Sequence, residues 1–370
     1  MTMYIFIGLS LALSLLFMPI IIKFCKKFSL YDYQSARKIH SGNIPRLGGI
    51  GIVLAFFISM VAYILTTREV VVTSYIPILL AGFIIFIFAI VDDLLNLPAI
   101  IKLIVQLIAV TIVTVNGYRF TQIGNLHLPT PVSFVLTFGW ILGVINAYNL
   151  IDGLDGLCGS LSITTIITMG LLYTLAGSNE GAICFILAAA IFGFLVFNWP
   201  PAKIFMGDNG SQFLGFMIAT MPLCSSDEVL EYNKFLIMII LTSFPVFDTI
   251  AAIWRRLRDK RPIMSPDRSH LHHKLLNLNY TKKNALYLIA FLQILLCGSV
   301  LISYFLGKAK GAAILLESAA FMIMFFSIIH YTNRKVLMVQ NAKSPEEAAS
   351  IKAPDDPVTE DNAEKEDIKE

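Results

Sequence analysis

Long apolar runs recur along almost the whole chain, and they constrain its fold more than any other feature. A helix needs about 20 largely apolar residues to cross the hydrocarbon core of a bilayer. The chain is 56% hydrophobic and 14% charged, whereas soluble domains have about 45–50% and about 25%. Backbone polar groups in lipid must be satisfied within helices. The pattern predicts an all-α integral membrane protein of about eleven transmembrane helices, near residues 3–22, 47–66, 74–91, 99–115, 131–147, 157–176, 181–197, 210–224, 235–253, 284–306 and 312–331.

The distribution of Lys and Arg predicts the orientation of these helices. When the loops are numbered alternately, one set holds seventeen of these residues, within 23–46, at Lys102, at Lys203 and within 255–283. The other set holds five. Because the excess of Lys and Arg marks cytoplasmic loops, we expect the N-terminus outside and the C-terminus in the cytoplasm.

The last thirty residues have a different composition. Residues 341–370 contain ten acidic residues, four lysines and no aromatic residue. Such a segment buries too little apolar surface to fold. We therefore divide the chain into a polytopic membrane domain, 1–335, and an acidic, disordered C-terminal tail, 341–370.

The unusual polar motifs gather on the loops assigned to the cytoplasm. They are SARKIHSGNIPRLGG (35–49), VDDLLNLP (91–98), NAYNLIDGLDGL (146–157), NWPPAKIFMGDNGSQ (198–212) and SPDRSHLHHKL (265–275). The loops of the opposite side carry no comparable Asp-rich or His-rich motif. A random scatter of polar loop residues would not sort in this way, so we expect one functional site on the cytoplasmic face.

Five aspartates lie at the ends of predicted spans: Asp92, Asp93, Asp152, Asp155 and Asp208. Acidic residues near hydrocarbon are costly and usually face a cavity with partners, although a single one could simply cap a helix. Like charges this close raise one another's pKa unless a cation lies between them. Oxygen ligands favour Mg²⁺ or Mn²⁺ over zinc. The cluster therefore predicts a divalent-metal site.

The remaining motifs are typical of a phosphate-bearing substrate. Glycines beside aspartate in IDGLDGL and MGDNGSQ could let a phosphate approach a helix N-terminus, or could form ordinary turns. The positive-inside signal does not account for His270, His272 and His273 after Arg268. Cationic donors facing a carboxylate-bound metal suit a polyphosphate; a zinc site made by the histidines is the alternative.

The residues alone therefore predict a membrane enzyme with a cytosolic, metal-dependent site that is open to a membrane-soluble second substrate. An ion-coupled transporter is the alternative outside the enzymes, because acids within the membrane can also mark ion paths. A transporter would place its acids near mid-membrane and often show inverted repeats. Here the acids lie at one face and no repeat is visible.

Four motifs in this order, DDLLNL, NAYNLIDGLDGL, FMGDNGS and DRSHLHH, resemble the polyprenyl-phosphate N-acetylhexosamine-1-phosphate transferases (glycosyltransferase family 4). The resemblance covers about residues 1–330. PRLGG at 45–49 and the SHLHH form look more like the WecA/TagO branch than MraY. The CDP-alcohol phosphotransferases are set aside, because no Ala-Arg follows the Asp-Gly of IDGLDGLCGS.

The resemblance implies roles for individual residues. The catalytic group would be Asp92, Asp93, Asn198 and His272, with Asp208 and Asn149 as metal ligands. The substrate-binding group would be Arg46, Lys102, Gly153, Asp155, Phe205, Arg268, His270 and His273. Mg²⁺ is the implied cofactor, with Mn²⁺ as a substitute.

The resemblance also implies an activity: transfer of N-acetylglucosamine-1-phosphate from UDP-N-acetylglucosamine to undecaprenyl phosphate, with release of UMP. This would be the first membrane step of a cell-envelope polysaccharide such as O-antigen or teichoic acid. The alternatives are a MraY-like transfer of phospho-N-acetylmuramoyl-pentapeptide and the transfer of another N-acetylhexosamine-1-phosphate. The expected setting is the bacterial inner membrane. The expected partners are the lipid bilayer and the two substrates, with a homodimer as a candidate assembly and no nucleic acid.

Overall fold

The computed structural model describes residues 2–31, 44–67, 75–224, 227–262 and 270–343. Its elements are α1 (Thr2–Lys27), α2 (Gly48–Thr67), α3 (Ile76–Leu95), α4 (Ala99–Val115), β1 (Gln122–Ile123), β2 (Leu126–His127), α5 (Thr130–Ile151), α6 (Leu157–Leu175), α7 (Gly181–Asn198), α8 (Asp208–Thr220), the 3₁₀ helix η2 (Met221–Cys224), α9 (Glu228–Leu241), α10 (Ser243–Arg258), α11 (Leu271–Asn277), α12 (Lys282–Leu306) and α13 (Lys308–Lys343). The predicted tail beyond Lys343 lies outside the described residues.

The helices follow the predicted apolar runs closely. Within the described ranges, eight helices are long and apolar enough to cross a membrane, and the bent pair α9–α10 adds a ninth if it is one span. The helix α4 is also apolar but has only 17 residues, and α8, with 13 residues, is shorter still and begins with a polar turn. An all-α membrane protein is therefore confirmed, with the small antiparallel hairpin β1–β2 as an addition. The count of eleven crossings and their direction stay predictions.

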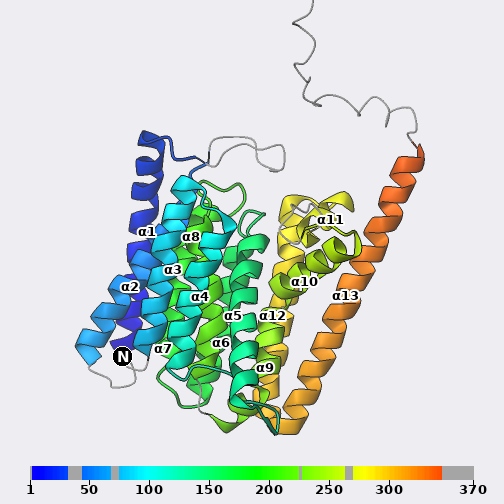
Figure 1. Cartoon of the computed structure of the whole chain (residues 1–370). Helices are drawn as coiled ribbons and strands as arrows, with labels where there is room; N and C mark the ends of the chain where they lie inside the picture. Colours follow the sequence, from blue (N-terminus) through cyan, green and yellow to red (C-terminus); the bar gives the residue numbers. More distant parts are fainter. Residues whose placement is uncertain (1, 32–43, 68–74, 225–226, 263–269, 344–370) are drawn as a thin grey trace, which may run out of the picture.

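The predicted span 235–253 is not one straight helix, which corrects the sequence interpretation. It falls across α9 and α10, which meet at an angle of 68°. Pro245 lies in the first turn of α10 and has no N–H, so it cannot continue the hydrogen-bond ladder of α9 to the carbonyl of Leu241. The break lets α10 leave the direction of α9 and approach α11 (Figure 1).

The short helix α8 lies at the centre of the bundle. It packs against α2, α3 and α5, and every residue from Asn209 to Thr220 is buried. Gly215 permits the close contact with α5, because a Cβ there would lie 2.9 Å from the Cα of Ile145. A helix surrounded by others places its first turn in a fixed environment, and that turn contains Asp208.

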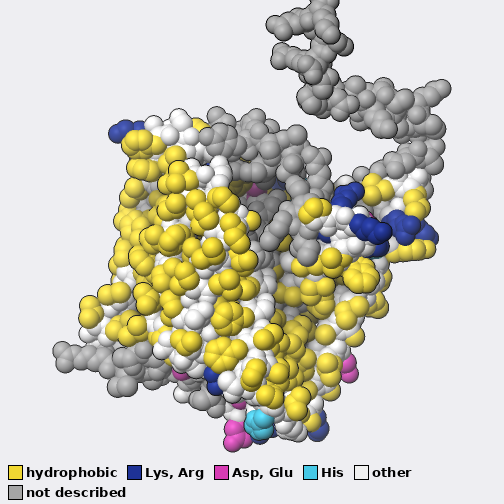
Figure 2. Space-filling model, in the orientation of Figure 1, with side chains coloured by type: hydrophobic (Ala, Val, Ile, Leu, Met, Phe, Trp, Pro, Cys, Tyr) yellow, Lys and Arg dark blue, Asp and Glu magenta, His cyan; other side chains and the backbone are white. Residues whose placement is uncertain are grey.

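Figure 1 shows that the start of α1 and the end of α13 lie at opposite ends of the bundle. We call the end that carries α11 and the end of α13 the upper end, as drawn there. Figure 2 shows apolar side chains over most of the visible face between the two ends, with a group of Lys and Arg near the upper end of α13. Lipid contact accounts for this exposed apolar surface.

Candidate active site

The turn between α3 and α4 is closed by the side chain of Asp92. Asn96 ends α3 in the left-handed conformation, with φ of 50°, and its N–H donates to the carbonyl of Asp92 at 2.7 Å. The N–H of Leu97 donates to Oδ1 of the same residue at 2.9 Å. Pro98 is the N-cap residue of α4 and lies directly before its first turn. The turn brings Lys102 on α4 back toward the end of α3.

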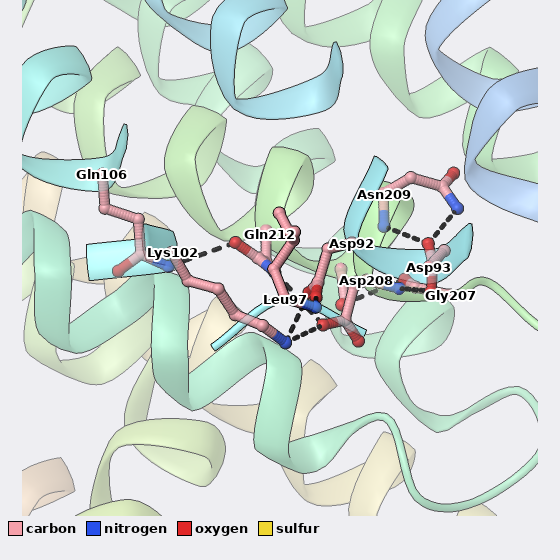
Figure 3. Close-up of polar contacts among 10 residues, drawn as sticks. Asp92, Asp93, Leu97, Lys102, Gln106, Gly207, Asp208, Asn209 and Gln212 are labelled. Carbon is pink, nitrogen blue, oxygen red and sulfur yellow. Dashed lines mark hydrogen bonds and ion pairs between the residues drawn. The ribbon is translucent and has the colours of Figure 1, made fainter. Parts of the chain in front are cut away.

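The ammonium group of Lys102 lies between two carboxylates that come from different helices (Figure 3). It forms an ion pair with Asp92 and lies 3.2 Å from Oδ2 of Asp208. The side chain of Asn149, near the end of α5, lies beside Asp208 and favours its ionised form. Two carboxylates that share one ammonium group keep an excess of negative charge, which favours a further cation. We call these four residues the carboxylate centre.

Asp93 points away from Lys102 and caps α8. Its Oδ1 accepts from the N–H of Asp208 at 3.2 Å, and its Oδ2 accepts from the N–H and Nδ2 of Asn209 at 2.9 and 2.6 Å (Figure 3). The N-cap residue of α8 is Gly207, which has no side chain to satisfy these donors. The cap therefore comes from the neighbouring helix, and its negative charge also suits the positive end of the helix dipole.

Gly207 is required at this junction. Its φ of 77° is in the region that favours glycine, and a Cβ would lie 2.2 Å from the carbonyl oxygen of Arg46. The segment around Arg46 is paired with the loop before α8, since the N–H of Phe205 donates to the carbonyl of Pro45 at 2.7 Å. The predicted residues Arg46 and Phe205 therefore lie next to the start of α8.

The turn between α5 and α6 is braced to the loop after α7 by Asn198. Its Oδ1 accepts from the N–H of Gly156 at 2.9 Å, and its Nδ2 donates to the carbonyl of Ile204 at 2.8 Å. Asp155 adds a second link, because its Oδ2 accepts from the N–H of Ala202 at 3.1 Å. Both side chains are buried. The contacts favour a positioning role for Asn198 over direct contact with a substrate.

The three predicted histidines lie at the start of α11, and a residue of α10 holds the first of them. Asp248 is buried; its Oδ2 lies 2.9 Å from Nδ1 of His270, and its Oδ1 accepts from the N–H of Leu271 at 2.9 Å. The rings of His270 and His272 are nearly parallel, and His272 also contacts the ring of His273. Arg268 lies outside the described residues.

His272 joins this group to the turn after α5. A Cβ on Gly153 would lie 2.9 Å from ring atoms of His272, so the ring lies directly against that glycine. Burial, together with the neighbouring His273, lowers the pKa of His272 to about 3. At neutral pH its imidazole is therefore uncharged, and it can offer hydrogen bonds but no positive charge to a substrate.

The structure brings the described predicted residues together at the upper ends of α3, α5, α7 and α8, the start of α4, and α11. Asn149 at the carboxylate centre and Gly153 against His272 are four residues apart, so the end of α5 joins the two parts. Sequence reasoning missed Asp248, Gln106, Gln212 and Asn146. Asp248 was visible as an acid within an apolar run, FPVFDTIAAIW, and the three amides lie one helical turn from predicted residues.

A cluster of a buried aspartate, a partly buried lysine and a partly buried aspartate at helix ends, inside a bundle of apolar helices, is typical of a membrane-embedded enzyme site for a charged substrate. Comparison with known proteins agrees. The model of glycosyl transferase family 4 matches residues 75–226, the range that runs from α3 to η2 and contains the carboxylate centre.

Relatives extend the match over most of the chain. A Bacillus subtilis (strain 168) protein named "Probable undecaprenyl-phosphate N-acetylglucosaminyl 1-phosphate transferase" is 34% identical over 86% of each chain. The Mycolicibacterium smegmatis decaprenyl-phosphate N-acetylglucosaminephosphotransferase is 30% identical over 71% of this chain and 72% of its own. The undecaprenyl-phosphate alpha-N-acetylglucosaminyl 1-phosphate transferase of Escherichia coli (strain K12) is 29% identical over 74% and 76%. The chain belongs to the polyprenyl-phosphate N-acetylhexosamine-1-phosphate transferase family, in its WecA/TagO-like branch, and is a phosphotransferase of this type.

Proposed function

We propose that this enzyme transfers N-acetylglucosamine-1-phosphate from UDP-N-acetylglucosamine to undecaprenyl phosphate and releases UMP. The observation that carries the proposal is the carboxylate centre, Asp92, Lys102, Asp208 and Asn149. It combines one cation for a phosphate with oxygen ligands for a metal, at the end of apolar helices. The names of the relatives support the sugar and the lipid carrier. The proposed setting is the bacterial inner membrane, with the site facing the cytoplasm.

Mg²⁺ is the proposed cofactor, and the donors at the carboxylate centre fit it. Asp208 offers carboxylate oxygens and Asn149 can offer its amide oxygen, and hard divalent cations prefer oxygen ligands. No group of three or more His, Cys, Asp or Glu side chains that could hold a metal is found in the described part of the chain. Mg²⁺ usually takes one or two carboxylates and completes its shell with water and substrate phosphates. When bound, it neutralises charge on the diphosphate.

In the proposed reaction, an oxygen of the lipid phosphate forms a bond to the sugar-linked phosphorus of the donor. The bond from that phosphorus to the bridging oxygen breaks, and UMP leaves with the electron pair. Lys102 would orient the lipid phosphate, because its ammonium group lies beside both carboxylates. A narrow crevice between α3 and α4, lined by Ile85, Phe88, Ala89 and Ile101, reaches Asp92 and Lys102. It supports an approach of the lipid from this side.

Asp92 is proposed as a positioning residue rather than a general base. A phosphate monoester has a second pKa of about 6, so it is largely ionised at neutral pH and has little need of a base. Both oxygens of Asp92 are engaged, one with the N–H of Leu97 and one with Lys102. Such a carboxylate holds the ammonium group in place.

The test is an assay of the purified protein in lipid nanodiscs with undecaprenyl phosphate and Mg²⁺. UDP-N-acetylglucosamine, UDP-N-acetylgalactosamine and UDP-N-acetylmuramoyl-pentapeptide are offered separately, and UMP and the lipid product are measured by mass spectrometry. We expect UMP and a lipid diphosphate sugar with UDP-N-acetylglucosamine, and loss of both in Asp208→Asn. Product from the muramoyl donor alone would favour the MraY-like alternative. UMP release without the lipid acceptor would argue against transfer.

A further inference from the structure

Three side-chain amides from three helices form a hydrogen-bonded series that ends on Asp208. Nδ2 of Asn146 donates to Oε1 of Gln106 at 3.1 Å, and Nε2 of Gln106 donates to Oε1 of Gln212 at 3.1 Å. Nε2 of Gln212 then donates to Oδ2 of Asp208 at 3.3 Å. Figure 3 shows Gln106 and Gln212 beside Lys102 and Asp208. We call Asn146, Gln106 and Gln212 the amide chain.

The amide chain lies deeper in the bundle than the carboxylate centre. Each of its members is one helical turn below a residue of that centre: Gln106 below Lys102, Gln212 below Asp208 and Asn146 below Asn149. Gln106 and Gln212 are 4% and 5% exposed, whereas Asn146 is an exposed residue. Asn146 is anchored at the start of the series, because its Nδ2 also donates to the carbonyl of Leu142 at 2.8 Å.

The two buried amides, Gln106 and Gln212, need an explanation at this depth. A buried polar group that loses its partner costs about 1–3 kcal/mol, and apolar side chains of the same size would fill the space without that risk. Interhelical amides sometimes serve only to join helices. Here the series has a direction, since each amide donates toward the next oxygen and the last oxygen belongs to a carboxylate. Aligned hydrogen bonds of this kind strengthen one another.

We infer that the amide chain positions Asp208 and sets how tightly this carboxylate holds its cation. Gln212 and Lys102 both meet Oδ2, so together they restrict rotation of the carboxylate about its Cβ–Cγ bond and fix the direction of Oδ1. The inference rests on the proposed function in that Asp208 is taken as the ligand of a divalent cation. Gln106, Gln212 and Asn146 are then positioning residues that act through Asp208.

The experiment measures Mn²⁺ binding to the purified protein without substrates, by electron paramagnetic resonance of the free ion. Gln212→Met and Gln106→Met each remove an amide at nearly constant volume. Partners outside the ligand shell typically change metal affinity by about 10–100-fold. We expect binding to weaken by about tenfold in Gln212→Met and by less in Gln106→Met. The matched control is Gln293→Met, which removes a buried amide that bonds to Thr165 and Leu241, remote from Asp208.

A double variant separates a positioning role from general packing. If Gln106 acts only through Gln212, then the double variant binds Mn²⁺ with the same affinity as Gln212→Met alone, because removing Gln106 has no further effect once Gln212 is gone. The two single variants should also need more Mg²⁺ for half-maximal UMP release. If Gln212→Met does not fold, the comparison of Mn²⁺ affinity between Gln106→Met and the control Gln293→Met tests the inference by itself.

Three results would overturn the inference. They are unchanged Mn²⁺ affinity in the folded amide variants, an equal loss in Gln293→Met, and no Mn²⁺ binding by the wild-type protein. None of them decides the proposed transfer, which the UDP-sugar assay tests on the wild-type chain. An active transferase with unchanged metal affinity in the variants would reject the amide chain alone.

Discussion

At the scale of single residues, two adjacent aspartates have different partners. Asp92 is bound to the N–H of Leu97 and to Lys102, whereas Asp93 accepts three hydrogen bonds from the start of α8. Successive residues on a helix point about 100° apart, so a pair at a helix end naturally faces two neighbours. The sequence motif alone does not distinguish the two aspartates. Their contacts place Asp92 in the carboxylate centre and make Asp93 the cap of α8.

Asp93→Asn should destabilise the protein more than Asp92→Asn. The asparagine would keep one acceptor oxygen and turn an NH₂ group toward the N–H donors of α8, and a buried donor without a partner costs about 1–3 kcal/mol. We expect a clearly lower midpoint of thermal unfolding in detergent for Asp93→Asn and a smaller decrease for Asp92→Asn. Equal midpoints in the two variants would contradict the capping role.

Asp92→Asn should reduce turnover by the same factor across pH. If Asp92 removed a proton from the lipid phosphate, its loss would matter less at a pH well above the second pKa of about 6, where that proton is already gone. A positioning role predicts instead a constant ratio of variant to wild-type rates between about pH 6.5 and about pH 9. The rate of UMP release measures this ratio. If the rate of UMP release by Asp92→Asn approached the wild-type rate at high pH, Asp92 would be a general base instead.

At the scale of elements, α11 depends on an uncharged histidine. Burial lowers the pKa of His272 to about 3, against about 6.5 in an unfolded chain. Between these values the unfolded chain binds a proton that the folded chain does not bind. The contribution to stability is therefore complete above about pH 6.5 and is lost progressively as the pH falls toward about 3.

The matching prediction compares thermal midpoints at about pH 7.5 and about pH 5. The wild-type midpoint should fall over this range, and His272→Gln should show a smaller decrease because it has no group to protonate. His127→Gln is the control, since His127 is an exposed residue of the hairpin β1–β2 and should leave the wild-type dependence unchanged. Parallel curves for the wild type and His272→Gln would refute the assignment to His272.

The bend between α9 and α10 marks the limit of what apolar periodicity predicts about elements. Each of the other ten predicted runs falls on one α-helix, with 210–224 continuing into η2, because length and hydropathy suffice for elements that lie in lipid. The run 235–253 is equally apolar, and only Pro245 indicates the break. The bend brings Asp248 to His270, so a missed bend and a missed site residue have the same cause.

The carboxylate centre could be assembled from sequence because its members stand at span ends that share one face. The contacts that each of these side chains makes could not be predicted from the sequence. The bond from the N–H of Leu97 to Oδ1 of Asp92 depends on the geometry of the turn after α3. The bond from the N–H of Gly156 to Oδ1 of Asn198 joins residues 42 positions apart, which apolar periodicity does not relate. Helical spacing would have found the amide chain, since Gln106 and Gln212 each follow a predicted residue by four positions.

At the scale of the whole molecule, the shortest membrane helix is the most enclosed one. The 13 residues of α8 cannot cross a bilayer by themselves, but the longer helices around α8 shield it from lipid. Its first turn can therefore remain polar and charged at a depth where lipid-facing helices are apolar. The arrangement fits a reaction between a water-soluble and a membrane-soluble substrate, because the site lies where polar ends and apolar walls meet.

The orientation of the bundle is the last prediction, and two cysteines test it. The Lys and Arg asymmetry places the upper end in the cytoplasm. Asn125 is exposed in the hairpin turn, which packs near α9 away from α11, and Lys260 is exposed just after α10. Of the native cysteines, four are buried and Cys224 is partly buried, so the wild type gives a low background.

In intact cells, a membrane-impermeant maleimide should label Asn125→Cys and leave Lys260→Cys unlabelled until the membrane is permeabilised. The physical reason is that translocating the basic segment around α10 and α11 would oppose the positive-inside rule. Labelling of Lys260→Cys from outside would show that the bundle has the opposite orientation. It would also place the carboxylate centre on the face without access to a cytosolic UDP-sugar, so the same experiment tests whether the site and its proposed donor share a compartment.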